Sequence, residues 1–192
     1  MYRLVLALCL LVIPARAEIA GLADAQAILA QLPPQSGKFT QVSGEKRILE
    51  GTFLFDFPHR LRFAYHKGAH SVVTIRRRWI AVQDFQGGEA NRFPVSATPL
   101  KLLLTDQGVR LDARYVGAIR RRADTLVVEL RDPTGDIPGK LRLRLTASPP
   151  RLRGWQSVDA QGTKTTVTLH DIAVAARLPD HLFHIQEDLS DE

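Results

Sequence analysis

Histidines are the first residues in this sequence that could do chemistry. His66 and His70 flank a glycine-containing turn, and His181 and His184 lie three residues apart near the C-terminus. Paired histidines serve as zinc ligands when cysteines or carboxylates complete the set. Neither pair brings a cysteine or a well-placed group of carboxylates, so we interpret all four as surface residues and expect no bound metal.

The residue patterns of common catalytic sites are also missing from the sequence. There is no G-x-S-x-G segment, no glycine loop of the kind that holds phosphate, and no cysteine after Cys9. The acids near the C-terminus, Asp180, Glu187 and Asp188, are typical of a solvated tail. We therefore expect a protein that is not an enzyme and needs no cofactor. An exported enzyme with an unfamiliar site is the alternative.

A stripe of aromatic residues occupies the segment GTFLFDFPHRLRFAY, residues 51–65, and contains five of the thirteen aromatic residues in the chain. Alternate residues of a strand share one face, so these rings lie on one side of a sheet. They either fill an ordinary core or line an apolar cavity, and the thin supply of apolar helices to cover the sheet favours a cavity. The stripe consists of Phe53, Phe55, Phe57, Leu61, Phe63 and Tyr65.

The elements that must position this stripe are mostly β-strands. From residue 38 onward the apolar residues recur with a period of two, and KLRLRLTA, residues 140–147, alternates leucine with basic residues. Such alternation is typical of an antiparallel sheet with one apolar face and one wet face. Turn-forming segments rich in Pro, Gly and Asp separate the strands at hairpin spacing. We predict an α+β protein, mainly β, built on a single antiparallel sheet.

Two helices are predicted beside the sheet. IAGLADAQAILAQL, residues 19–32, repeats apolar residues at helical spacing, and PPQSG ends it. A second, short helix is predicted within SATPLKLLLTDQG, residues 96–108, with Thr98 as its cap and Pro99 as its first residue. The residues of this helix that would share one face are Leu100, Leu103 and Leu104.

The N-terminal segment MYRLVLALCLLVIPARA, residues 1–17, is typical of a signal peptide. It has Arg3 before an apolar run and ends on an A-x-A site, which predicts cleavage before Glu18 and export to a bacterial periplasm. A membrane-spanning helix takes about 20 residues, more than this run supplies, and a retained short anchor is the alternative. The mature chain, residues 18–192, is predicted to form one domain without a cysteine.

Arginine triplets at residues 76–78 and 120–122 carry much of the positive charge. Removal of residues 1–17 leaves 24 Lys and Arg against 20 Asp and Glu, which is a modest excess. An exported protein rarely meets nucleic acid, so we expect none as a partner. The first triplet, Arg76, Arg77 and Arg78, is a candidate docking site for an acidic partner or an anionic membrane surface. A plain solvated surface is the alternative.

Several segments, taken in order, resemble the LolA family of periplasmic lipoprotein carriers. KFTQ, residues 38–41, is similar to the opening F-x-Q of the family, and GTFLFDFPHRLRFAY to its glycine, apolar alternation, proline and aromatic-flanked arginine. VVTIRRRWIAVQD occupies the place of the next hairpin, and TPLKLLL is similar to the Pro-Leu-rich helix that follows. WQSVDAQGTKTTVTL and LPDHLFHI, with Phe183, are similar to late segments. The likeness covers most of the mature chain.

The resemblance implies an unclosed β-barrel covered by a lid of short helices, with an apolar cavity for the acyl chains of lipoproteins. It implies delivery from an inner-membrane ABC transporter to the outer membrane, often through a receptor, and we expect a monomer. Leu100, Leu103 and Leu104 would form the lid. The implied acyl-chain site comprises Phe53, Phe55, Phe57, Leu61, Phe63, Tyr65, Val73, Ile75, Ile80 and Val82.

The sequence departs from the family pattern at the residue that latches the lid. Many members have an arginine immediately before the strand-breaking proline, and here that residue is Phe57. Arg60 and Arg62 are the candidate latches, although alternation places both on the face opposite to Leu61 and Phe63. The family's Asp-Gly turn is also replaced here, by the first arginine triplet.

Two other binding functions remain as alternatives to lipoprotein transport. The first is a periplasmic sensory or interaction module of the same fold, although such modules usually have a second domain that this length does not accommodate. The second is a carrier of another apolar ligand in a lipocalin-like barrel, although the helix predicted at residues 96–108 interrupts the strand order of that barrel.

Overall fold

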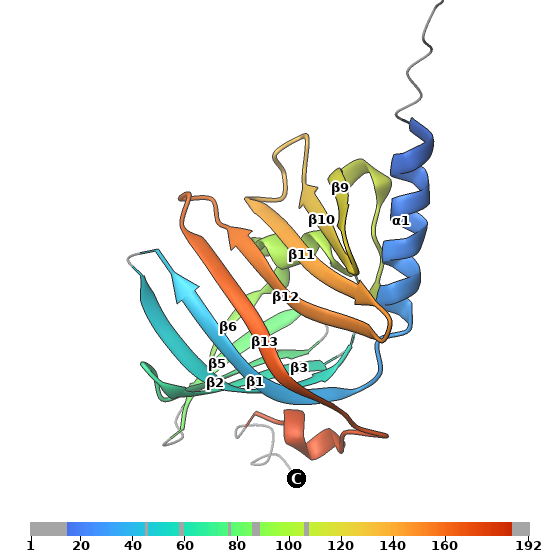
Figure 1. The fold of residues 1–192 in the computed structure, drawn as a ribbon. Coiled ribbons are helices and arrows are strands. Elements are labelled where there is room, and N and C mark those ends of the chain that lie inside the picture. Colours follow the sequence, from blue (N-terminus) through green and yellow to red (C-terminus); the bar gives the residue numbers. More distant parts are fainter. Residues whose placement is uncertain are drawn as a thin grey trace, which may run out of the picture.

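The computed structural model describes residues 15–44, 46–57, 60–76, 78–85, 89–105 and 108–185. The helix α1 (Ala15–Ala30) leads into a series of antiparallel strands. Eleven of them form one sheet in the order β6-β5-β4-β3-β2-β1-β13-β12-β11-β10-β9. β1 pairs with both β2 and β13, so the first and last strands meet in the middle of the sheet. Figure 1 shows the curved sheet with α1 beside β9 to β12 and the short turns behind these strands.

The strands alternate along the chain with short connections. Those of the large sheet are β1 (Gln35–Ser43), β2 (Arg47–Asp56), β3 (Arg60–Lys67), β4 (Ser71–Arg76), β5 (Trp79–Asp84), β6 (Asn91–Pro94), β9 (Val116–Arg122), β10 (Thr125–Arg131), β11 (Lys140–Ala147), β12 (Pro150–Val158) and β13 (Lys164–Val174). The strands β7 (Leu104–Thr105) and β8 (Gly108–Val109) form a separate two-stranded hairpin. The two outer strands of the large sheet, β6 and β9, do not pair with each other. The predicted unclosed antiparallel sheet is therefore confirmed.

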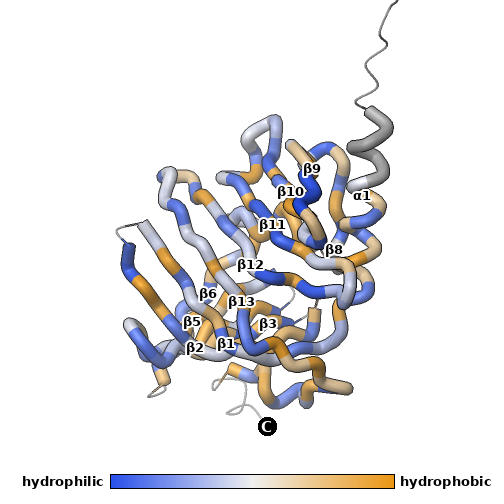
Figure 2. The backbone as a smooth tube through the Cα atoms, in the orientation of Figure 1, coloured by the Kyte–Doolittle hydropathy of each residue, from blue (hydrophilic) through white to orange (hydrophobic). Residues whose placement is uncertain are grey.

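Alternation along the strands places the main core on the concave face of the sheet. In β11, Leu141, Leu143 and Leu145 are buried, whereas Lys140 and Arg142 are exposed. Figure 2 shows the same alternation of hydrophilic and hydrophobic residues along the neighbouring strands. Because successive side chains of a strand point to opposite faces, one strand supplies both an apolar lining and a basic outer surface.

The helix α1 covers one end of this concave face. Its Ala25, Ile28 and Leu29 are buried, as is Leu32 beyond its end. The segment 33–34 is Pro-Pro, which cannot continue a helix because proline lacks a backbone N–H. The helix predicted over residues 19–32 is present, beginning within the described residues at Ala15. Among the described residues no helix is both long and apolar enough to cross a bilayer.

The predicted signal peptide lies mostly outside the described residues. Residues 1–14 are not described, and the predicted cleavage point before Glu18 falls inside α1. Cleavage there remains a prediction.

The second predicted helix, within residues 96–108, is present as short 3₁₀ turns. The chain forms two 3₁₀ turns, η1 (Val95–Ala97) and η2 (Pro99–Leu102), and then passes into β7. The predicted cap is present, since the Thr98 hydroxyl oxygen accepts from the Leu100 N–H at 3.3 Å. Leu102, Leu103 and Leu104 are buried in succession, at the end of η2 and the start of β7.

A smaller core lies on the convex face of β3, β4 and β5. The C-terminal turn η4 (Asp180–Phe183) packs there against β3, with the Phe183 ring fully buried. Ala64 and Thr74 are also buried, although they alternate with residues of the concave face. Figure 1 shows η4 on the outer side of the sheet. Both faces of this part of the sheet are therefore covered.

Candidate functional site

The concave face holds an apolar cavity of about 30 Å³. Three parts of the chain that lie far apart in the sequence meet around it: β2 to β4, the segment after η1, and the strands β11 and β12. Aromatic and aliphatic side chains line it, and none of the lining residues is charged. They are Phe55, Phe57, Leu61, Phe63, Ile75, Leu100, Leu103, Leu104, Leu143, Leu152 and Trp155.

The aromatic stripe forms a continuous set of ring contacts beside this cavity. The ring centroids of Phe55 and Phe63 lie 5.3 Å apart, and Trp155 lies 5.7 Å from Phe63. Phe39 of β1 makes edge contacts with Phe63 at 5.3 Å and with Tyr65 at 4.9 Å. Offset and edge-to-face arrangements at these distances are the favoured ones. The rings of β1, β2 and β3 thus form one wall, which Trp155 of β12 contacts.

Half of the residues predicted for the acyl-chain site line the cavity, and the others lie around it. The first group is Phe55, Phe57, Leu61, Phe63 and Ile75. Phe53 and Ile80 are buried in the main core outside the lining, Tyr65 and Val73 are partly buried against it, and Val82 is half-buried in β5. All three predicted lid leucines line the cavity. Whether any of them contacts an acyl chain remains a prediction.

Sequence reasoning missed the wall opposite to the stripe. Leu143, Leu152 and Trp155 come from β11 and β12, about ninety residues further along the chain. The local signal for Leu143 was visible, because KLRLRLTA alternates strictly. The position of Leu143 across the cavity from the aromatic stripe could not be seen in the sequence. It depends on the pairing of β1 with β13, which brings the two halves of the chain together.

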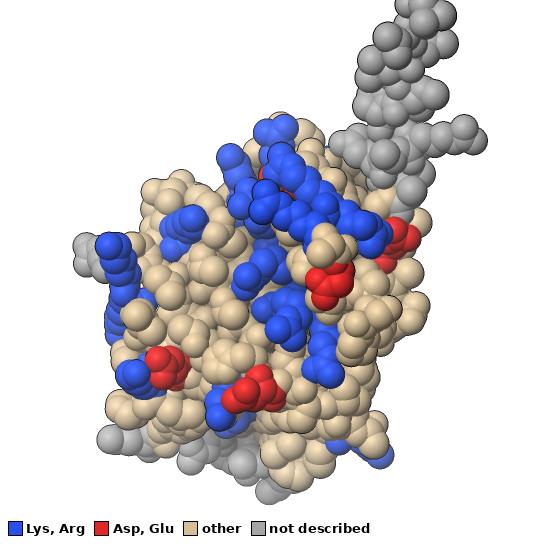
Figure 3. Space-filling view, viewed as in Figure 1, with Lys and Arg blue, Asp and Glu red and all other residues tan. Residues whose placement is uncertain are grey.

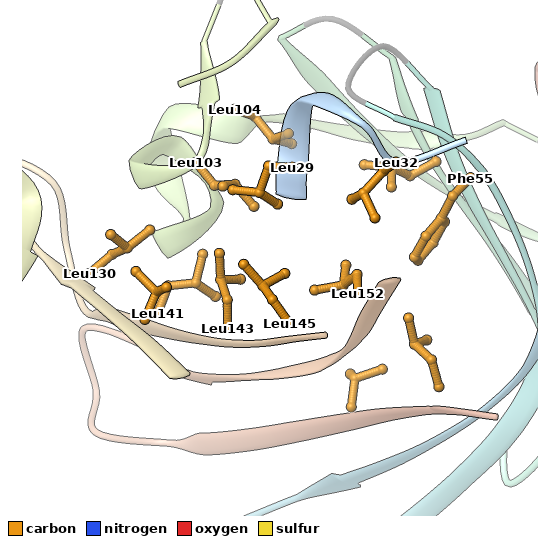
Figure 4. Packing of buried hydrophobic residues seen from close by; sticks show 14 of the residues in the cluster. Leu29, Leu32, Phe55, Leu103, Leu104, Leu130, Leu141, Leu143, Leu145 and Leu152 are labelled. Atoms are coloured by element: carbon orange, nitrogen blue, oxygen red, sulfur yellow. The ribbon is translucent and has the colours of Figure 1, made fainter. Parts of the chain in front are cut away.

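A lid segment, defined here as residues 95–104, closes the cavity from the side opposite to the sheet. Figure 4 shows Leu103 and Leu104 next to Leu29 of α1, all facing the leucines of β11. The segment satisfies much of its backbone internally: Thr98 N–H bonds to Val95 O at 3.0 Å and Leu103 N–H to Leu100 O at 3.0 Å. Its end pairs with β8 in the small hairpin, not with the large sheet. Leucine packing therefore holds most of the lid segment on the sheet.

The anchor points of the lid segment lie at its ends. At its start, Val95 N–H donates to Arg78 O at 2.8 Å, next to β5. Beyond its end, the Leu111 N–H donates to the Gln26 side-chain oxygen of α1 at 2.8 Å. The lid segment is thus tied to β5 before it and to α1 after it.

The polar groups nearest the ring wall are uncharged. The Tyr65 hydroxyl donates to Gln41 Oε1 at 2.9 Å, and burial raises the pKa of Tyr65 to about 12, so the phenol stays neutral at physiological pH. Gln35, which lies opposite Phe55 in the register of β1 and β2, is also buried. An uncharged, mostly apolar interior favours binding of hydrocarbon.

The candidate latch Arg60 fastens a different segment from the one expected. It lies on the convex face, where it forms ion pairs with Asp56 and with Asp180 of η4. Its guanidinium stacks over the Phe183 ring at 4.7 Å and donates to Leu178 O at 3.3 Å. The lid segment lies on the concave face, so Arg60 latches the C-terminal turn. Its companion Arg62 lines a convex-face pocket together with residues of that C-terminal segment, because both arginines alternate with Leu61.

The remaining charged candidates lie on the outer surface. Arg76 comes within 3.8 Å of Asp180, and Arg77 lies outside the described residues. In the second triplet, Arg120 pairs with Glu129 at 2.8 Å and Arg121 pairs with Asp24 of α1. Among the residues that the structure describes, no group of three His, Cys, Asp or Glu side chains could hold a metal ion.

The fold and the cavity define a class of protein: an open antiparallel sheet that encloses an apolar space beneath a short lid. The family model described as "Outer membrane lipoprotein carrier protein LolA" matches residues 32–186. The chain therefore belongs to the LolA family, and the resemblance seen in the sequence is confirmed. No curated protein matches the chain in sequence.

Solved structures with a similar fold come from several bacteria. A LolA-superfamily protein from Nitrosomonas europaea has a TM-score of 0.51 at 12% identity, covering 88% of this chain and 98% of that one. An uncharacterised conserved protein from Thermus thermophilus also has a TM-score of 0.51, at 11% identity, with 88% and 94% covered. A putative outer membrane lipoprotein-sorting protein domain from Vibrio parahaemolyticus has a TM-score of 0.50 at 10% identity, with 89% and 98% covered. At such low identities these matches establish the fold alone.

Proposed function

We propose that this protein is a periplasmic carrier that shields the acyl chains of lipoproteins and moves them from the inner to the outer membrane. One observation carries the proposal: in a chain of the LolA family, the apolar cavity is closed by three leucines on a lid segment outside the large sheet. The donor would be an inner-membrane ABC transporter, and the acceptor an outer-membrane receptor or the membrane itself. Residues 1–17 would act as the export signal.

The size of the cavity requires the lid segment to move when cargo enters. At about 30 Å³, the cavity has room for a few water-sized groups, since one water molecule needs about 10–15 Å³ of such space. An acyl chain has many methylene groups, so it cannot enter while Leu100, Leu103 and Leu104 lie on the sheet. In the empty protein these leucines act as a replaceable part of the core, and the cargo would take their place.

Such an exchange suits a carrier thermodynamically. Each methylene group withdrawn from water contributes about 0.8 kcal/mol, so several free acyl chains would face a cost of tens of kcal/mol. A cavity that returned the whole of this energy would never release its cargo. The cargo must displace leucines that were already buried. The net binding free energy is therefore the difference between the contacts of the cavity with the acyl chains and its contacts with the lid leucines. Release to an acceptor then needs no nucleotide bound to the carrier.

The substitution Leu103→Glu tests this proposal. The side chain is 3% exposed, but the lid segment can lift and place a charge in water without breaking the ladder of the large sheet. We expect Leu103→Glu to retain the far-ultraviolet circular dichroism of the wild type and to lose lipoprotein uptake. Uptake is measured by transfer of a triacylated lipoprotein from detergent, followed by native mass spectrometry of the complex.

Leu145→Glu is the matched control. Leu145 is fully buried within β11 and cannot leave the sheet, so a charge there should unfold the protein. If Leu103→Glu also unfolded the protein, the lid segment would be fixed core and the proposal would be wrong. Native mass spectrometry that showed a small apolar ligand bound in place of a lipoprotein would favour the alternative carrier function.

A further inference from the structure

A second surface of this protein carries a dense array of positive charge on the convex side of β9, β10 and β11. We call it the basic face and define it by Arg120, Arg122, Arg131, Lys140, Arg142 and Arg144. Figure 3, which views the molecule from this side, shows blue side chains gathered over these strands. The proposed carrier function makes no use of it, because it lies on the opposite side of β11 from the cavity.

The register of the three strands explains why these side chains share one face. Arg120 and Arg144 both lie opposite Val127, on either side of β10. Arg142 lies opposite Glu129, and Lys140 opposite Arg131. Paired residues on neighbouring strands point to the same side of a sheet, and the leucines between them point to the core. The cations therefore stand in rows separated by about 4.8 Å, the spacing between strands.

Few acids offset this charge. In the three strands the acid is Glu129, whose carboxylate pairs with Arg120 at 2.8 Å and with Arg142 at 2.9 Å. Its single negative charge offsets one of the six positive charges. The adjoining turns contain Asp124, Asp132, Asp136 and Asp159. Each accepts a hydrogen bond from a residue close to it in the sequence.

A groove of about 280 Å³ runs across the basic face. Gly117 and Ala118 lie on one side of it, where the lack of large side chains leaves the strand backbone open. The charged residues that line it are Arg120, Glu129, Arg131, Lys140 and Arg142. Its volume is well above the roughly 10–15 Å³ that one water molecule needs. The groove is thus a shallow, cation-lined hollow within a broader positive surface.

The composition of the basic face decides which kind of partner fits it. Specific protein interfaces centre on aromatic and other apolar anchors, and single-stranded nucleic acid requires aromatic rings for base stacking. The outward residues of β9, β10 and β11 include no aromatic residue, and Trp155 of the next strand points into the cavity. Rows of cations without anchors match a surface of repeated anionic groups, for which each Lys or Arg adds attraction without a defined pose.

We propose that the basic face docks the protein on a membrane surface rich in anionic phospholipid headgroups. Attachment through β9 to β11 leaves the lid segment and the cavity accessible on the other side of the sheet. Phosphates of the headgroups would pair with Arg120, Arg142 and Arg144, and the groove would admit a headgroup among Arg131 and Lys140. This docking does not require the cavity to carry a lipoprotein, so the two proposals can fail separately.

Vesicle sedimentation with the full chain tests the docking surface. Vesicles of phosphatidylglycerol and phosphatidylcholine should bind the wild type at low salt and release it at high salt, because the attraction is screened. Vesicles of phosphatidylcholine alone should bind little. This comparison distinguishes electrostatic attraction from insertion of apolar residues around the cavity into the bilayer. The double variant Arg142→Gln, Arg144→Gln should bind the anionic vesicles roughly 30-fold more weakly, at roughly fivefold per cation.

The matched control removes two cations from the other half of the sheet. Arg47→Gln, Lys67→Gln changes the net charge equally, at exposed positions in β2 and β3, and should bind like the wild type. Equal weakening of both variants would mean attraction by net charge alone and would overturn the proposal. Failure of the wild type to bind anionic vesicles would also overturn it and leave an acidic protein as the occupant. Displacement by inorganic phosphate, beyond that by chloride at equal ionic strength, would indicate a discrete phosphate site and would equally overturn membrane docking.

Discussion

Gly51 is the residue at which two strands of the ring wall approach most tightly. A Cβ atom built there would lie 2.0 Å from Ala64 O in β3 and 2.9 Å from Phe39 Cε1 in β1. A register shift between β2 and β3 falls at the same place, and such bulges bend a sheet. The absence of a side chain at residue 51 therefore lets Phe39 pack against Tyr65 and gives the wall its curvature.

Substitution of Gly51 should consequently destabilise the whole protein. We expect Gly51→Ala to lower the free energy of unfolding by about 3 kcal/mol, at the upper end of overpacking effects, because the obstructing atoms are backbone. Gly44→Ala is the control, since its Cβ would meet only Thr163 Cγ2 at an ordinary 3.6 Å. Urea unfolding followed by tryptophan fluorescence measures both. Similar midpoints for the two variants would show that β2 and β3 can separate without cost.

At the scale of elements, the C-terminal turn η4 depends on a small electrostatic cluster. The hydrogen bonds from His184 and Arg60 lower the pKa of Asp180 below its ordinary value of 3.8. The bond to Asp56 is the largest cause of the raised pKa of Arg60. Because the folded state binds the Asp180 proton more weakly, the cluster stabilises η4 above pH 3.8. This contribution is lost as the pH falls through the lowered pKa.

We therefore predict that acid releases the C-terminal segment before the sheet unfolds. Hydrogen exchange of residues 178–185 should accelerate as the pH falls below 3.8 toward the lowered pKa of Asp180, after correction for the intrinsic rate, while β11 stays protected. Asp180→Asn should show faster exchange in this segment already at pH 6. The control Asp124→Asn changes an acid that bonds the neighbouring Thr125 and should leave the segment unchanged. If residues 178–185 were protected from hydrogen exchange equally in Asp180→Asn and in the wild type, packing of Phe183 alone would account for the stability of the turn.

An element could be predicted from the sequence where contacts between residues close in the chain determine it. The β11 strand could be read from KLRLRLTA because local alternation and burial agree there. The short helix of the lid segment could also be read, and Leu100, Leu103 and Leu104 all line the cavity. The burial of Leu102 was not predicted, because a face made of Leu100, Leu103 and Leu104 does not include it. Thr98 was predicted correctly as a cap because capping depends only on its own neighbours.

At the scale of the whole molecule, the cavity is a product of strand order. One wall was predicted from residues 51–65, whereas the other comes from β11 and β12, which meet it only after β1 pairs with β13. The same limit applies to Arg60, whose partner Asp180 is 120 residues away. The period-two pattern predicted which face of each strand is apolar, but it contains no information on which strands become neighbours.

The strand order also divides the molecule into a permanent part and a replaceable part. Residues 140–146 of β11 are held by ladders to both β10 and β12, whereas the lid segment has internal bonds such as Lys101 N–H to Thr98 O at 3.1 Å. A single hydrogen-bonded turn is unstable in water once its packing is lost. If cargo displaces the lid leucines, the turn should therefore loosen while the sheet remains intact.

Loading should thus speed up hydrogen exchange in the lid segment, whereas an ordinary ligand slows hydrogen exchange at its binding site. We predict that lipoprotein binding accelerates hydrogen exchange at Lys101 and Leu103 by at least tenfold, with residues 141–145 unchanged. Mass spectrometry of the isolated complex, compared with the empty protein at the same pH, measures both segments at once. The Leu103→Glu variant provides the reference for a displaced lid, since its exchange should already be fast without cargo. Slower hydrogen exchange at Leu103 on loading would mean that the lid segment closes over the cargo. The lid leucines would then keep their contacts in the loaded protein, and the proposed displacement by cargo would be wrong.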